Sequence, residues 1–176
     1  METVSSRQVY ANAWMTVRED TIRRADGSIG SYGVVDKPPG ALIIPLDGDR
    51  LHLVEQFRYT VGHRRWEFPS GTVPAEPELD AKTLAARELR EETGLRAGHL
   101  EPLGVLDIAP GMTSQRLAIF LASGLVEGEH QREHEEQDMR TGWFNRQQFE
   151  TMIRSGDVVD APTIAAYTLL LLHESR

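Results

Sequence analysis

The first part of the chain alternates short apolar stretches with turns, a pattern that predicts β-strands. β-Forming residues occupy positions 4–19 and 21–24, and Asp26-Gly27 is a hairpin-type turn signal. Residues 41–46 form a nearly continuous apolar run, which is typical of a buried strand. After a polar turn, residues 51–57 begin with alternating leucines, so we expect them to pair back as the second strand of a hairpin.

Helical signals appear in the middle of the chain. The segment from Asp80 to Thr93 combines a good N-cap, strong helix formers and Gly94 just beyond its end. Residues 103–108 and 117–122 then predict two further strands.

The last part of the chain predicts two more helices. Asn145 with Gln148 resembles a capping box, opening a helix that Gly156 ends. Pro162 suits the first turn of a final helix that runs to Leu172. Strands followed by a helix, strands and helices favour an α+β or mixed-sheet α/β sandwich over a doubly wound repeat.

A proline-rich break divides the predicted elements into two parts. Pro-Pro-Gly at 38–40 favours a boundary. We therefore expect an N-terminal strand extension at residues 1–38 and a larger domain at residues 39–176. The extension is too short to build a core of its own.

Composition narrows the class of protein. The chain has 176 residues, of which 40% are hydrophobic, and this supports a folded core. It has no cysteine, which excludes disulfides, thiolate metal sites and cysteine nucleophiles and fits a reducing cytosol. The start lacks the apolar core of a signal peptide, and residues 169–172 are too short an apolar run to cross a bilayer. We expect a soluble, cytoplasmic protein without a membrane partner.

The balance of charge argues against nucleic acid as a partner. Asp and Glu number 27 against 19 Lys and Arg, so the formal net charge is −8. A chain of this charge binds polyanions poorly unless its basic residues cluster or a cation intervenes.

Two glutamates lie on the apolar side of the predicted helix. At 100° per residue, Ala81, Ala85, Glu88 and Glu92 fall on one line. An ordinary solvated charge run is the alternative interpretation, but its carboxylates would lie opposite the alanines. Like charges four residues apart cost about 0.2–0.5 kcal/mol even when exposed. A cation between them would remove this cost, and oxygen ligands suit Mg²⁺ or Mn²⁺.

A turn precedes this helix. Gly71 allows a tight backbone turn that could direct the Ser70 carbonyl toward the same cation. Pro-Ser-Gly is also common in turns that have no such role.

The helix and this turn together resemble a known motif. Gly71 and the run Arg-Glu-Leu-Arg-Glu-Glu-Thr-Gly-Leu from Arg87 to Leu95 resemble the Nudix box, G-x5-E-x7-R-E-U-x-E-E-x-G-U with U aliphatic. The second half matches at every specified position. Arg87 lies 16 residues after Gly71 where the box has 14, and Pro77 stands at the early glutamate position. On a loop two residues longer, Glu76 or Glu78 could replace that glutamate.

The resemblance implies a Nudix fold, a mixed sheet between helices, and hydrolysis of a nucleoside diphosphate linked to another group. Carried over by position, Glu88 and Glu92 would be the principal ligands of Mg²⁺ or Mn²⁺. Glu91 would assist them, and the Ser70 carbonyl would contribute. Arg87 would orient the carboxylates.

Residues before the box resemble the ADP-ribose pyrophosphatase branch of this family. They are Val-Glu-Gln-Phe-Arg-Tyr at 54–59 and Arg-Trp-Glu-Phe-Pro-Ser-Gly at 65–71. Arg58 could bind a phosphate or pair with a carboxylate, and Trp66 could stack on a base or fill the core. The resemblance also implies that Glu55 and Glu67 bind substrate.

Residues after the box add two further points of resemblance. Pro110 lies 16 residues after Gly94, and in this branch a proline near that position, here followed by Met112, marks substrate binding. A plain loop at a strand end is the alternative. The acidic run 127–138 is either a solvated loop or the segment in which branch members place a catalytic glutamate. By that match Glu135 is the expected general base and Glu136 the second choice.

The expected activity is metal-dependent hydrolysis of the pyrophosphate bond of a nucleotide sugar, with ADP-ribose giving AMP and ribose 5-phosphate. The alternatives are another nucleotide sugar such as GDP-mannose, a non-catalytic nucleotide sensor and a plain interaction domain. Branch members often dimerise through N-terminal strands, so we expect a homodimer. No histidine receives a role, and His52 is expected to point outward from its strand.

Overall fold

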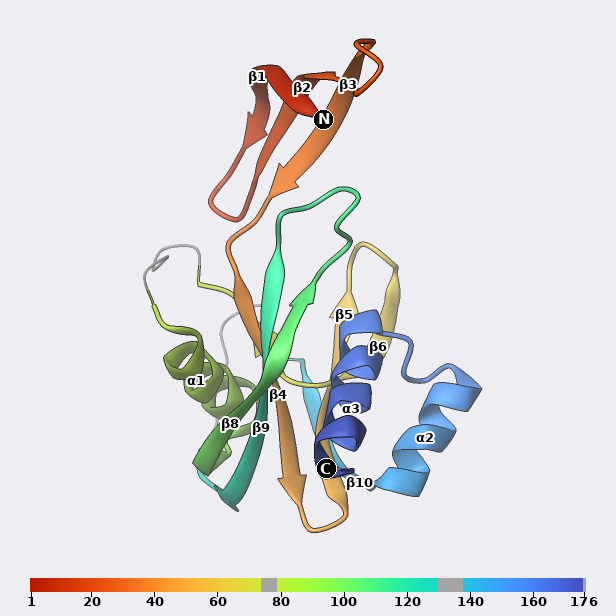
Figure 1. Cartoon of the computed structure of the whole chain (residues 1–176). Coiled ribbons are helices and arrows are strands. Elements are labelled where there is room, and N and C mark those ends of the chain that lie inside the picture. Colours follow the sequence, from red (N-terminus) through yellow and green to blue (C-terminus); the bar gives the residue numbers. More distant parts are fainter. Residues whose placement is uncertain (74–78, 130–137, 176) are drawn as a thin grey trace.

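The N-terminal residues form a small antiparallel sheet that projects from the rest of the molecule (Figure 1). The computed structural model describes residues 1–73, 79–129 and 138–175. The small sheet contains β1 (Glu2–Ala11), β2 (Thr16–Arg23) and β3 (Ile29–Asp36) in sequence order. The predicted turn at Asp26 is confirmed, because Gly27 has a φ of +83° and the Asp26 carboxylate accepts a hydrogen bond from the Ser28 amide.

The second sheet is mixed, as the Nudix resemblance implied and as one of the two fold classes favoured by the order of elements requires. It runs β10-β5-β4-β9-β8, with β6 paired to β5 and β7 paired to β4. β4 and β9 are parallel, whereas the other pairs are antiparallel. The strands of this sheet are β4 (Gly40–Asp47), β5 (Arg50–Arg58), β6 (His63–Glu67), β7 (Ser70–Gly71), β8 (Arg96–Asp107), β9 (Arg116–Val126) and β10 (Arg140–Asn145).

Helices cover both faces of this sheet (Figure 1). Alternate residues of β4 explain the arrangement: Ala41 and Ile43 pack with α1 (Ala81–Thr93), and Leu42 and Ile44 face the opposite core. That second core includes residues of α2 (Arg146–Ser155) and α3 (Ala161–Glu174). The predicted mixed sheet between helices is therefore confirmed.

The helix ends follow their predicted caps. The Asp80 carboxylate accepts hydrogen bonds from the amides of Lys82 and Thr83, and Gly94 adopts a left-handed φ of +76°. Asn145 and Gln148 form the expected capping box of α2. No described helix has the length and apolarity needed to cross a bilayer.

The sequence pattern missed or misplaced several features of the sheet. β8 begins at Arg96, seven residues before the expected strand, and neither β6 nor β10 was predicted. The expectation that His52 points outward is wrong: its side chain is buried and packs edge-on against Trp143, with ring centroids 4.7 Å apart. The sheet has a core on each face, so both sides of β5 are covered.

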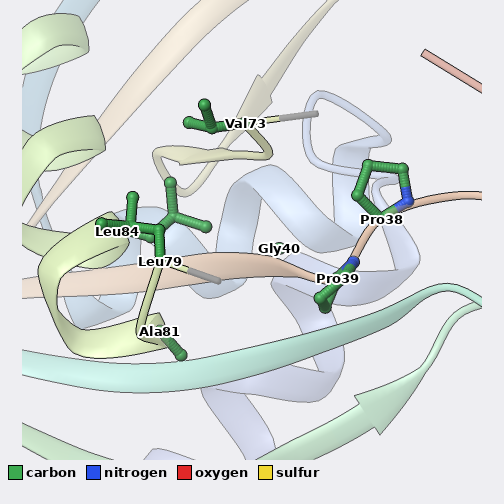
Figure 2. A pocket seen from close by; sticks show the side chains of 7 residues that line it. All are labelled: Pro38, Pro39, Gly40, Val73, Leu79, Ala81 and Leu84. Carbon is green, nitrogen blue, oxygen red and sulfur yellow. The ribbon is translucent and has the colours of Figure 1, made fainter. Parts of the chain in front are cut away.

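The chain passes from the small sheet to the large one through Pro38 and Pro39. These prolines border a small apolar pocket beside the start of α1 (Figure 2), with a volume of about 40 Å³. The pocket is lined by Pro38, Pro39, Gly40, Val73, Leu79, Ala81 and Leu84. Its size and apolar lining suit packing of the junction rather than binding of a nucleotide.

Candidate active site

Helix α1 directs two acidic side chains inward, as its helical phase predicted. Glu88 is 7% exposed and Glu92 is 2% exposed, among buried neighbours that include Leu84 and Leu89. Burying a carboxylate is costly unless hydrogen bonds or a cation compensate it. The alternative of a fully solvated charge run is therefore excluded for these two residues.

Both carboxylates lie against the short strand β7. The Ser70 amide donates a hydrogen bond to Glu92 Oε2 at 3.2 Å. A Cβ added to Gly71 would lie 2.3 Å from Glu88 Oε2, so only glycine allows this approach. The turn before the helix and the acidic face of the helix thus meet.

Glu91 and Arg87 lie beside this face rather than within it. Both are half-buried. A carboxylate oxygen of Glu91 lies 3.5 Å from Arg90 Nη2, so this acid is partly neutralised by its helical neighbour.

The oxygen atoms gathered at this turn are chemically suitable ligands for a hard divalent cation. They belong to two buried carboxylates beside a backbone turn, and oxygen ligands are those that Mg²⁺ and Mn²⁺ prefer. Among the described residues, no group of three or more His, Cys, Asp or Glu side chains is arranged to hold a metal. The fit therefore depends on the Glu88 and Glu92 pair and on the oxygens that Ser70 and a substrate would add.

An ion pair between the half-buried Arg58 and the buried Glu67 lies next to these acids. Arg58 Nη2 is 2.9 Å from Glu67 Oε1, and Arg58 Nε donates to Glu67 Oε2 at 3.3 Å. Burial raises the pKa of Glu67, although Arg58 opposes this effect. Burial alone would lower the pKa of Arg58, but Glu67, Glu92 and Asp160 together raise it. The electrostatic contribution of Glu92 links this pair to the acids of α1.

A cavity of about 230 Å³ adjoins the ion pair and the β7 turn. It contains three predicted site residues, Arg58, Glu67 and Ser70. Its lining is Lys37, Arg58, Glu67, Ser70, Gly71, Thr72, Ile108, Gln115, Leu117, Asp160 and Pro162. Cations, acids and an amide around one space suit a ligand that carries both phosphates and hydroxyls.

Lys37, Gln115 and Asp160 were missed by sequence reasoning. Lys37 follows β3, and Gln115 precedes β9. Asp160 is the N-cap of α3, which the Asp-Ala-Pro sequence could have suggested. Only the tertiary structure brings these three positions to one cavity.

Glu55 and Trp66 do not line this cavity. Glu55 Oε2 lies 2.9 Å from Arg64 Nε and 3.6 Å from Arg140 Nη1, so two arginines neutralise it. Trp66 is half-buried against the larger core and meets Phe144 edge-on, with centroids 4.9 Å apart. The structure thus gives Trp66 packing partners and Glu55 ion-pair partners.

Pro110 and Met112 lie in a loop joined to the N-terminal sheet. The Val35 amide donates to the Met112 carbonyl at 2.8 Å, and the Tyr32 hydroxyl donates to the Gly111 carbonyl at 2.9 Å. Met112 is 57% exposed. The cavity is lined by residues at the two ends of this loop and not by Pro110 or Met112.

The predicted bases Glu135 and Glu136 lie outside the described residues, as do Glu76 and Glu78. The structure does describe Asp138. Arg64 donates to the Asp138 carboxylate at 2.6 Å and to its carbonyl at 2.9 Å, which fixes the chain just before β10.

Comparison with known proteins matches both parts of the chain to families. Residues 1–35 match a nucleoside diphosphate sugar hydrolase N-terminal domain, and residues 36–167 match a NUDIX domain. The chain is 36% identical over 166 residues to the ADP-ribose pyrophosphatase of Mycobacterium tuberculosis (strain ATCC 25618 / H37Rv), covering 93% of this chain and 80% of that protein.

More distant relatives extend the likeness to the whole chain. The ADP-ribose pyrophosphatase of Bacillus subtilis (strain 168) is 25% identical over 178 residues, covering 99% of this chain and 94% of that protein. The crystal structure of an ADP compounds hydrolase superposes with a TM-score of 0.83 at 22% identity, covering 98% of this chain and 91% of the other. This last likeness shows a shared fold. With the NUDIX match over residues 36–167, these findings establish that the chain belongs to the Nudix hydrolase family.

Proposed function

We propose that this protein hydrolyses the pyrophosphate bond of ADP-ribose, giving AMP and ribose 5-phosphate, with Mg²⁺ or Mn²⁺ as cofactor. Membership of the Nudix family supports the class of reaction. The relative in Mycobacterium tuberculosis is named an ADP-ribose pyrophosphatase, and its 36% identity spans most of both chains, which supports the substrate.

The observation that carries the proposal is the buried pair Glu88 and Glu92 against the Ser70–Gly71 turn, beside a cavity that contains Arg58. Two acids placed so close to this cavity would repel a pyrophosphate. A divalent cation held by these acids would change this repulsion into attraction.

The acids of α1 would hold the cation. Glu88 and Glu92 would be its main ligands, Glu91 would assist, and the Ser70 carbonyl would complete the protein's share. Arg87 would orient the carboxylates. When bound, the cation neutralises phosphate oxygens and lowers the pKa of water.

The cavity would bind the rest of the substrate. Arg58 and Lys37 offer positive charge to phosphates, and Glu67 holds Arg58 in place through two contacts. Substrate contacts by Glu55, Trp66, Pro110 and Met112 stay predictions from the family resemblance.

A base must accept a proton from the attacking water or orient it. The family resemblance assigns this role to Glu135, with Glu136 as second choice. For Glu135→Gln we expect kcat to fall more than KM rises, because a base acts on the reacting water rather than on substrate binding.

A substrate panel tests the proposed activity. Purified protein with Mg²⁺ is offered ADP-ribose or GDP-mannose, and AMP or GMP release is followed by chromatography. We expect ADP-ribose to be cleaved faster. Fast turnover of GDP-mannose without turnover of ADP-ribose would assign another nucleotide sugar, whereas tight binding of ADP-ribose without cleavage would identify a sensor.

We further propose a homodimer formed through the N-terminal sheet. Every residue of β1 is exposed, and the sheet presents large apolar side chains to the surface. They include Val4, Val9, Tyr10, Trp14, Ile29 and Tyr32. A second copy would cover this surface. The cytoplasmic location stays a prediction, which cell fractionation can test.

A further inference from the structure

The segment that carries Glu67 is fastened on one side of this residue to the first turn of α3 and on the other side to the connection between α2 and α3. The Phe68 amide donates a hydrogen bond to Thr163 Oγ1 at 3.0 Å, and both residues are 0% exposed. On the other side, the Trp66 amide donates to the Asp157 carbonyl at 3.4 Å, just before α3. Glu67 therefore lies between two anchored backbone positions.

The Phe68 amide depends on this hydroxyl. β6 ends at Glu67 and β7 begins at Ser70, so Phe68 lies between the two strands. A buried amide without an acceptor is costly. Thr163 supplies the acceptor, and the bond joins residues 95 positions apart in the sequence.

The first turn of α3 is itself rigid. The Asp160 carboxylate accepts a hydrogen bond from the Thr163 amide at 2.8 Å, and Pro162 restricts the same turn. Asp160 and Pro162 also line the cavity that contains Arg58 and Glu67. Thr163 thus joins a fixed helix start to the strand end that bears Glu67.

We propose that Thr163 is a positioning residue, which holds Glu67, and through its ion pair Arg58, in the orientation that the cavity requires. This inference rests on the proposed function, because it takes the cavity as the substrate site. Thr163 has no contact with substrate in this proposal and acts only through the Phe68 backbone. The hydroxyl, not the volume of the side chain, is the essential feature.

Thr163→Val removes the acceptor and nearly preserves the shape. We expect KM for ADP-ribose to rise about five- to tenfold while kcat changes less than about twofold, because the acids of α1 stay in place. Thr163→Ser retains the hydroxyl and should restore KM to within about twofold of wild type. Amide hydrogen exchange should be faster at Phe68 in the valine variant only.

Tyr167→Phe is the matched control. It removes a hydroxyl from the same helix, one that donates to Glu150 at 3.1 Å, and Tyr167 does not line the cavity. We expect a loss of thermal stability with unchanged KM. If Thr163→Val does not fold, Thr163→Ala paired with Thr163→Ser gives the same comparison in a smaller side chain.

Three results would overturn the inference. These are an unchanged KM in Thr163→Val, a KM shift that serine does not reverse, and a fall in kcat alone that follows the folded fraction. Failure of the proposed function is a different result, since wild-type protein would then leave ADP-ribose intact. Amide hydrogen exchange at Phe68 and calorimetry of ADP-ribose binding would still distinguish Thr163→Val from Thr163→Ser.

Discussion

Glu88 and Glu92 bring two like charges onto a nearly dry helix face, a placement that weakens a helix unless something compensates it. The Ser70 amide compensates Glu92 in part. Arg58 also lies close enough to Glu92 for their opposite charges to attract.

Replacing Glu92 by glutamine should separate the contribution of this residue to metal binding from its effect on stability. Gln can still accept a hydrogen bond from the Ser70 amide but is a poor ligand for Mg²⁺. We expect kcat for ADP-ribose to fall about a hundredfold or more. The melting temperature without metal should change little, because the substitution removes both the repulsion from Glu88 and the attraction of Arg58. Glu101→Gln, an exposed acid in β8, is the control, and unchanged turnover in Glu92→Gln would refute the metal-face assignment.

Gly71 is also predicted to be sensitive to substitution, although less than Glu92. In Gly71→Ala the new Cβ would meet the Glu88 carboxylate at 2.3 Å and displace it. We expect kcat to fall about tenfold or more and the Mg²⁺ concentration for half-maximal rate to rise. Gly33→Ala is a suitable control, since a Cβ there meets nothing within 4 Å. Equal activity of the two variants would show that the close approach is not needed for catalysis.

At the scale of elements, β5 shows how burial on both faces of a sheet changes the protonation state of a side chain. Leu51 and Leu53 pack in one core, while His52 between them turns to the other face and meets Trp143. Burial lowers the pKa of His52 to about 4 from its ordinary value of 6.5. The strand therefore carries a neutral histidine at physiological pH.

This pKa shift predicts a dependence of stability on pH. Because the folded state binds the proton less readily than the unfolded state, His52 costs nothing above about pH 6.5 and destabilises the fold as pH falls toward 4, by up to about 3 kcal/mol. Urea unfolding of His52→Phe should show a shallower loss of stability than wild type between these pH values. His63→Gln, at an exposed histidine, should follow wild type. Parallel curves for His52→Phe and wild type would contradict the assignment.

At the scale of the whole molecule, the described residues of the N-terminal sheet and the Nudix domain meet at the loop around Met112. Apart from the chain connection at Pro38, the described contacts include the hydrogen bonds from β3 to the loop around Met112. This places the N-terminal sheet beside a loop whose ends line the cavity. Dimerisation through the sheet would therefore act on this loop, and through the ends of the loop on the lining of the cavity.

The proposed dimer can be tested by placing negative charges on the exposed apolar side chains of β1. With Val4 and Val9 both changed to glutamate, repulsion between copies should replace apolar contact. We expect light scattering after gel filtration to show a mass near 19.8 kDa for the variant and twice that value for wild type. Thr3→Glu, an exposed polar position on β1, is the control. A wild-type mass near 19.8 kDa would end the dimer proposal.

The sequence by itself determined the features that depend on local chemistry. The caps of α1, the capping box of α2 and the inward phase of Glu88 and Glu92 follow from residues within one or two helical turns of each other. Helix geometry is fixed by local hydrogen bonds, so these predictions needed no knowledge of distant parts. The order of elements left an α+β fold or a mixed-sheet sandwich open, and the family resemblance implied the mixed sheet between helices.

Only the tertiary structure decided which distant residues meet. Lys37, Gln115 and Asp160 come to one cavity from three separate parts of the chain, and Phe68 finds its acceptor in Thr163. His52 is buried because an element beyond its own hairpin covers it. Strand pairing and helix docking create these contacts across long separations. No local pattern encodes them, because the free energy that selects them comes from burial summed over the whole core.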